Sequence, residues 1–70
     1  MSTFKDANQA RVHLKMSLSN YYWYNFSDVL SYTSNMGSYY IGVSVKYLNQ
    51  KIKKAIPNYI NGTPVKIFVD

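Results

Sequence analysis

The stretch that decides the fold is residues 39–47, which read Tyr39-Tyr40-Ile41-Gly42-Val43-Ser44-Val45-Lys46-Tyr47. Apolar residues alternate with small or polar ones along its length, and this period of two is typical of a β-strand with one buried face. The second face carries Tyr40, Gly42, Ser44 and Lys46, and we expect it to meet solvent or a partner. Gly42 within such a strand indicates a bulge or a close backbone approach.

A second strand is predicted at residues 64–70, where the alternation returns. Val65, Ile67 and Val69 form one face there, and Lys66, Phe68 and Asp70 form the other. Pro64 can open this strand, because its missing N–H does least harm at a strand start. Asn61-Gly62, just before it, is a strong turn signal.

The connection between these strands reads as a helix over residues 48–56. Leu48, Ile52, Ala55 and Ile56 share one helical face. Asn49 is a plausible N-cap, and Pro57 stops the helix near Ile56. The alternative is a hairpin that turns at Asn49-Gln50, but alternation fails at Lys53-Lys54, which favours the helix.

The N-terminal segment predicts a helix over residues 3–19, with Thr3 as N-cap and Asp6 in its first turn. One stripe at three- and four-residue steps would face the core: Phe4, Ala7, Ala10, Leu14 and Leu18. Val12 and Met16 widen this apolar side, so the helix could touch two neighbours.

Residues 20–31 are harder to interpret. Their aromatic content favours a short strand or extended segment at residues 20–26, although a continued helix or an aromatic loop stays open. Ser27 can cap a short helix through Thr33, with Asp28 in its first turn. Residues 35–37, which end at Gly37, would supply its exit.

Together these elements predict a small two-layer α+β domain spanning residues 1–70. An N-terminal helix precedes a sheet of two or three strands, whose C-terminal unit is strand-helix-strand. The crossover is long enough for parallel pairing and would be right-handed. Two strands alone are marginal, so residues 20–26 or a second copy of the chain should supply the third.

Composition narrows the class of protein. The chain of 70 residues has eight tyrosines, eight Lys or Arg against three Asp, no Cys, one His and a formal charge of +5. Disulfides, thiolate metal sites and multi-His sites are thus excluded within one chain, and so short a core favours support from a homodimer.

No signal peptide or membrane span is visible, so we expect a cytoplasmic protein. Asn, Lys, Tyr and Ile, which have A/T-rich codons, are abundant in the chain. This composition is typical of phage or plasmid proteins, and a phage-encoded protein would act in the host cytoplasm.

Catalysis is not expected, and neither is a metal or cofactor. His13 is the single histidine and is best explained as an ordinary helix residue. Without Glu, acid–base pairs would depend on three Asp residues, two of which suit helix starts. The three glycines are too far apart for a phosphate-binding loop.

Positive charge beside aromatic rings instead predicts a binding protein for RNA or single-stranded nucleic acid. The candidate phosphate-binding residues are Arg11, Lys15, Lys46, Lys51, Lys53 and Lys54. The candidate stacking residues are Trp23, Tyr24 and Tyr40, and at least one or two rings of residues 21–24 should be exposed. Tyr40, Lys46, Lys66 and Phe68 would share a sheet face if the two strands adjoin.

Two other interpretations remain open. Lysines on a short helix are commonly a solvated face, and the rings could fill a small core or cover a dimer mate; we assign Tyr32, Tyr39, Tyr47 and Tyr59 to packing. The alternative function is a phage- or plasmid-type inhibitor, similar in role to an antitoxin. It would block a host defence enzyme or nuclease by fitting the same residues into an acidic groove.

Overall fold

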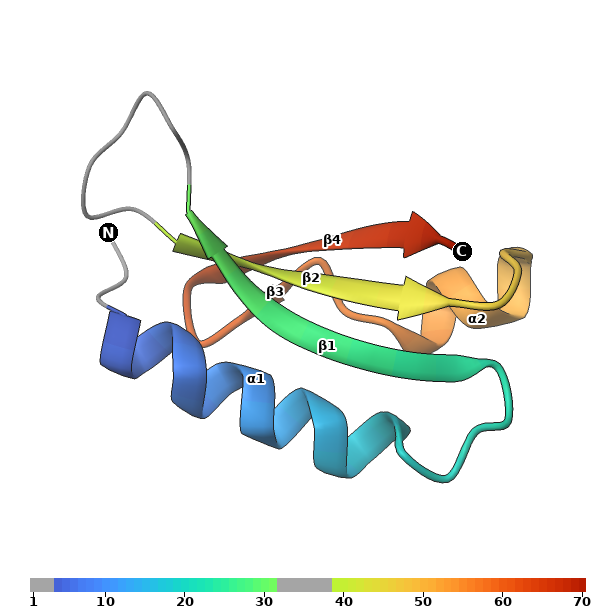
Figure 1. Ribbon diagram of the computed structural model, residues 1–70, viewed down its shortest axis with the longest axis horizontal. Coiled ribbons are helices and arrows are strands. Elements are labelled where there is room, and N and C mark those ends of the chain that lie inside the picture. Colours follow the sequence, from blue (N-terminus) through green and yellow to red (C-terminus); the bar gives the residue numbers. More distant parts are fainter. Residues whose placement is uncertain (1–3, 32–38) are drawn as a thin grey trace.

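A computed structural model of the chain describes residues 4–31 and 39–70. Two helices and four strands follow the order α1 (Phe4–Leu18), β1 (Tyr24–Ser31), β2 (Tyr39–Val45), α2 (Gln50–Ala55), β3 (Tyr59–Ile60) and β4 (Thr63–Val69). The strands form one sheet in the spatial order β1-β2-β4-β3, and α1 lies across one of its faces (Figure 1). The predicted two-layer α+β domain is therefore confirmed, with one strand more than expected.

Helix α1 packs through a narrow stripe. Ala7, Ala10, Leu14 and Leu18 are buried, and the two alanines let the backbone lie close to the sheet. Phe4, by contrast, is exposed at the helix start, where its ring meets Tyr39 edge to face at 5.5 Å. The prediction that Val12 and Met16 widen the buried side is wrong: both are exposed, because among the described residues α1 packs against the sheet through its other side. Thr3, the predicted cap, lies outside the described residues.

Strand β1 replaces a predicted helix. Residues 27–31 were expected to be helical, yet they pair antiparallel with β2 from Ser27↔Val43 to Ser31↔Tyr39. The Ser27 hydroxyl makes a 2.8 Å hydrogen bond with the Tyr24 hydroxyl and does not cap a helix. The predicted helix end and its exit, residues 32–37, lie outside the described residues.

The segment before β1 is extended only in part. Residues 19–23 form tight turns, in which the Tyr24 amide donates to the Tyr21 carbonyl at 3.2 Å. The strand then begins at Tyr24 with an irregular register between Tyr24 and Phe26. Asn25 occupies this bulge, and its side-chain nitrogen is buried with no hydrogen-bond partner among the described residues.

The strand-helix-strand unit is confirmed. Strands β2 and β4 are adjacent and parallel, with Ile41↔Val65 at one end of the ladder and Val45↔Val69 at the other. Helix α2 joins them, so the alternative hairpin at Asn49-Gln50 is wrong. The Asn49 side chain caps α2 by accepting a hydrogen bond from the Ile52 amide at 2.9 Å.

A two-residue strand, β3, was not predicted. It forms a hairpin with β4 through Asn61 and Gly62, whose φ angles are both positive, at 50° and 83°. Positive φ at both central residues is the geometry of a type I′ turn, for which Asn-Gly is the favoured sequence.

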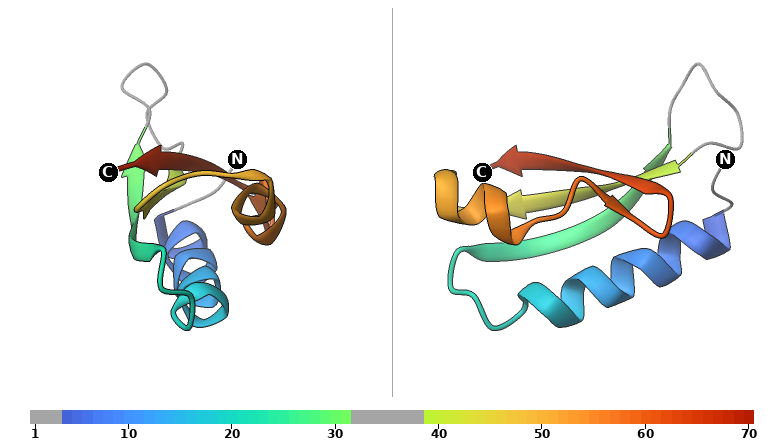
Figure 2. Two further views of the ribbon diagram at one scale, coloured as in Figure 1. Left: turned by 90° about the vertical axis from the view of Figure 1, so that its right-hand side faces the viewer. Right: turned by 180° about the vertical axis from the view of Figure 1, so that it is seen from behind.

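The core lies between α1 and the sheet. Trp23, Ile52 and Ile56 join the inward residues of α1 and β2 there. The inward residues of β2 are Ile41, Val43 and Val45, all fully buried as the alternation predicts. The opposite face of the sheet turns away from both helices (Figure 2).

Candidate nucleic-acid interface

The clearest candidate site is at one end of the molecule, where β1 begins, β2 ends and α2 follows (Figures 1 and 2). Antiparallel pairing brings Tyr24 opposite Val45, and the Lys46 amide donates to the Trp23 carbonyl at 2.9 Å. We call this region the aromatic–basic end. It consists of Tyr21, Tyr22, Lys46, Tyr47, Lys51, Lys53 and Lys54, all exposed.

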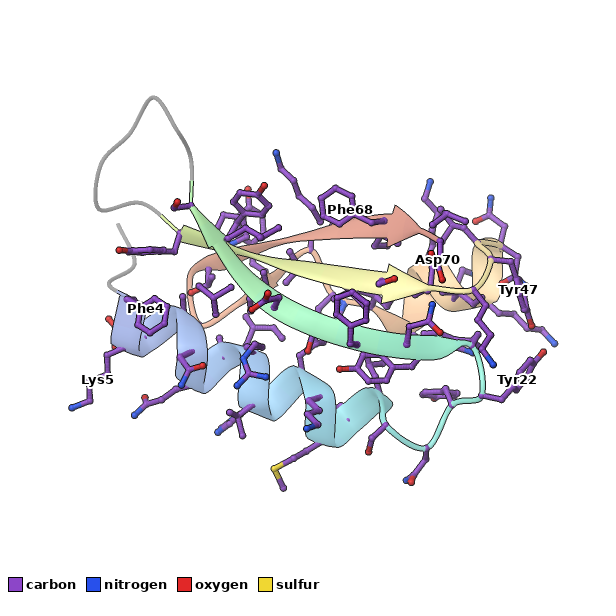
Figure 3. All side chains as sticks on the ribbon, viewed as in Figure 1. Phe4, Lys5, Tyr22, Tyr47, Phe68 and Asp70 are labelled. Atoms are coloured by element: carbon purple, nitrogen blue, oxygen red, sulfur yellow. The ribbon has the colours of Figure 1, made fainter. Side chains whose placement is uncertain are left out.

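Tyr22 and Tyr47 lie side by side at this end (Figure 3). Tyr22 is 72% exposed. The two ring centroids are 6.1 Å apart with the planes tilted by 47°, and the hydroxyl groups are hydrogen-bonded to each other. This hydrogen bond raises the pKa of Tyr47 above its usual value of 10.0, with smaller contributions from desolvation and from the charge that Tyr22 acquires on ionisation.

Trp23 does not reach solvent. It is 6% exposed within the core, and the Tyr21 ring stacks on it at 4.7 Å with 20° between the planes. A base could not reach the indole without displacing Tyr21 or opening the core. We therefore withdraw Trp23 as a stacking residue, while the expectation that one or two of these rings are exposed is confirmed by Tyr21 and Tyr22.

Tyr24 lies at the aromatic–basic end, where β1 begins, but its ring is not open, and Tyr40 lies towards the other end of the sheet. Tyr24 is half-buried, and its hydroxyl is bonded to Ser27. Tyr40 is half-buried near the start of β2, with the Lys66 Nζ 4.8 Å above its ring centre. Neither offers an open ring beside the lysines of α2.

The predicted basic residues fall into two groups. Lys46 follows β2, and Lys51, Lys53 and Lys54 are exposed on α2, so these four share the aromatic–basic end. Arg11 and Lys15 are on α1 instead. Arg11 is half-buried, and its Nε donates to the Asn8 side-chain oxygen at 3.1 Å.

The sheet face opposite the helices is a separate surface, which we call the open face. It carries Phe26, Asp28, Leu30, Tyr40, Gly42, Ser44, Lys66 and Phe68. The register brings Tyr40, Lys66 and Phe68 to one face as expected. The sequence interpretation missed Phe26, Asp28 and Leu30, because it placed the last two on a helix and left the facing of Phe26 open.

A shallow depression of about 240 Å³ lies on the open face. Phe26 and Phe68 flank it at 60% and 47% exposure, and Gly42 forms part of its floor. An added Cβ at Gly42 would lie 2.8 Å from Leu30 Cδ1 and 2.9 Å from Phe68 Cε2. The close approach predicted at Gly42 is thus made by side chains, and the bulge is in β1 instead.

Two of the tyrosines assigned to packing are exposed: Tyr59 on β3, at 66%, and Tyr47. Tyr39 is half-buried, and Tyr32 lies outside the described residues. The signal that could have identified Tyr47 is its position directly after Lys46, where the strand gives way to the connection with α2.

Over residues 4–31 and 39–70, no group of three or more His, Cys, Asp or Glu side chains is placed to hold a metal ion. Within the same ranges, no helix has the length and apolar character needed to cross a membrane. What the aromatic–basic end offers chemically is ring faces and ammonium groups.

Comparison with known proteins found no match to any protein-family model, to any curated protein or to any solved structure.

Proposed function

We propose that the chain is a non-enzymatic binding protein that holds RNA or single-stranded nucleic acid at the aromatic–basic end. The observation that carries the proposal is the exposed pair of Tyr22 and Tyr47 at the same end of the molecule as Lys46 and the lysines of α2. Unpaired bases stack on such rings, and lysines bind the phosphates between them.

Tyr22 and Tyr47 would have different roles in stacking. Because the Tyr47 hydroxyl is bonded to that of Tyr22, it limits the orientations that the more exposed ring can take. Less rotational freedom is then lost when a base stacks on Tyr22. The lysines contribute affinity without sequence choice, since phosphate contacts carry no base information.

The test is a salt titration of binding to a single-stranded RNA and to duplex DNA. Phosphate contacts by the four lysines predict a log–log slope of about −3 on the single strand. Replacing Lys51, Lys53 and Lys54 with Ala should make that slope shallower by about 2. Tyr22→Ala should cost about 1–3 kcal/mol, the usual value of one stacked base.

Matched controls come from the same chain. Tyr59→Ala removes a tyrosine of similar exposure from β3, and Lys5→Ala removes a lysine from the start of α1. Both should leave RNA binding unchanged. The proposal fails if micromolar protein retains no RNA at low salt, or if the triple lysine variant binds as well as the natural chain.

The alternative function uses the same end of the molecule. An inhibitor of a host defence enzyme or nuclease would place Tyr22 and the α2 lysines in an acidic groove of that protein. Its signature is a complex captured from host lysate that survives nuclease treatment and is lost with Tyr22→Ala but not with Tyr59→Ala. Either ligand would place the chain in the cytoplasm, that of the host if the chain is phage-encoded.

A further inference from the structure

The open face combines apolar exposure with a defined charge pattern. Phe68 is about half exposed on it, on the side of the sheet away from α1 (Figure 3). Phe26 is also about half exposed, and the register places it on the same face. Large exposed rings that flank a depression are typical of a contact surface. Asp28 is the charged residue of β1 on this face and Lys66 is that of β4, and these two strands flank β2.

The register arranges these residues in rows across the sheet. Asp28, Gly42 and Lys66 form one row, because Gly42 of β2 pairs with Asp28 on one side and with Lys66 on the other. Phe26, Ser44 and Phe68 form the next row in the same way. In each row a small residue of β2 is central, and the larger side chains stand on either side of it.

These rows are self-complementary when the open faces of two copies of the chain meet across a twofold axis. The axis runs parallel to β2, midway between the two sheets. This rotation exchanges the β1 side of one copy with the β4 side of the other. Asp28 then faces Lys66 of the second copy, and Phe26 faces Phe68 of the second copy. Every contact occurs twice, as an isologous interface requires.

We propose that the open face is the contact between two copies of this chain, packed sheet against sheet. Facing sheets lie about 10 Å apart with their strands nearly aligned. Rings from one copy can then fill the depression of the other, and α1 and α2 remain on the outside. The aromatic–basic ends lie outside this contact.

Charge argues for a second copy over a polyanion at this face. Asp28 on the open face, with Asp70 also beside the depression, would repel phosphate. The same carboxylate at Asp28 is attracted by Lys66 of a second copy, and the Lys66 ammonium already lies over this face at the Tyr40 ring.

The test is a mixing experiment with charge reversals, followed by sedimentation equilibrium. Asp28→Lys places two Lys–Lys pairs in the homodimer, and Lys66→Asp places two Asp–Asp pairs, so each variant alone should dimerise at least about tenfold more weakly. A one-to-one mixture restores both opposite-charge pairs. Its heterodimer should form within about threefold of the natural dissociation constant, since each pair regains its Coulomb attraction.

Controls separate this contact from general effects of charge. Lys5→Asp and Gln9→Lys on the exposed side of α1, alone or mixed, should leave dimerisation unchanged. Phe26→Ala should weaken it, whereas Tyr59→Ala should not. The proposal is overturned if the natural chain is monomeric at millimolar concentration, or if the mixture dimerises no better than the single variants. It is also overturned if a dimer forms that neither charge reversal weakens, which is the result expected of a dimer paired through the β1 edge.

Discussion

Gly42 lies beneath Leu30 Cδ1 and Phe68 Cε2, which an added Cβ would approach to 2.8 and 2.9 Å. Both atoms end side chains that can turn towards solvent from the open face. We therefore expect Gly42→Ala to change the free energy of unfolding by less than about 1 kcal/mol, because the lower entropy of the unfolded chain offsets the displacement. Urea denaturation at concentrations where the chain is monomeric measures this. A loss above about 2 kcal/mol would mean that the two side chains are held rigidly.

Gly62 is held by the opposite constraint. An added Cβ would meet nothing within 4 Å, but φ is 83°, where side chains are strained. Gly62→Ala should therefore destabilise the fold by about 1–2 kcal/mol, although it creates no clash. Urea denaturation compares Gly62→Ala directly with Gly42→Ala. Equal losses in the free energy of unfolding would contradict the assignment of backbone strain to Gly62 and of side-chain contact to Gly42.

The pair of Tyr22 and Tyr47 predicts a loss of stability at high pH. The pKa of Tyr47 is raised in the folded state, so the folded chain keeps a proton that the unfolded chain releases. This contribution is fully present below the usual tyrosine pKa of 10.0 and is lost as pH rises through the higher folded value. Tyr22→Phe removes the hydroxyl partner, so the pKa of Tyr47 should fall and the melting temperature should depend less on pH above 10. Ultraviolet titration and thermal melts measure the two effects.

At the scale of the element, α2 depends on its cap. It has six residues, and such short helices are marginal without tertiary or capping support. Asn49→Ala removes the side-chain acceptor of the Ile52 amide and should lower the free energy of unfolding by about 1 kcal/mol. Gln50→Ala, at the next and exposed position, is the control and should have little effect. A neutral Asn49→Ala would show that Ile52 and Ile56 hold the helix alone.

Elements whose local pattern agrees with their packing were predicted well. The alternation of residues 39–47, the cap at Asn49 and the turn at Asn61-Gly62 each specify one conformation that the sheet also needs. Residues 27–31 were predicted wrongly because Ser27 and Asp28 carry a genuine helix-start pattern. Pairing of β1 with β2 stabilises the extended conformation more than this helix-start pattern stabilises a helix, since a short helix has little stability of its own.

The candidate site was less predictable than the fold. The lysines at positions 46, 51, 53 and 54 were identified, because their charge is visible in sequence. Tyr22 and Tyr47 were not identified as stacking residues, because the packing of the whole fold decides which tyrosines stay exposed. Trp23 enters the core, while Tyr22, the neighbour before it, remains outside in a turn that no local pattern specifies.

At the scale of the whole molecule, the aromatic–basic end and the open face should act independently. The triple lysine variant of α2 should lose RNA affinity and keep its dimerisation constant, because α2 lies outside the open face. Asp28→Lys should weaken dimerisation and leave the RNA affinity of the monomer unchanged within about twofold, since distant sites are usually additive. Binding assays on both variants, below and above the dimerisation midpoint, measure this. Loss of both activities in either variant would show that the two surfaces are coupled.

The parallel pairing of β2 with β4 has a kinetic consequence. Hairpins such as β3–β4 need only local contacts, but the β2–β4 ladder cannot close until the chain has looped back through α2. The entropy of that loop is lost before the ladder stabilises anything, which slows folding. We therefore expect the β2–β4 pair to form late in folding, and one edge of β2 stays unpaired until it forms. The time for which this edge stays open sets how long the chain is vulnerable to pairing with the wrong strand.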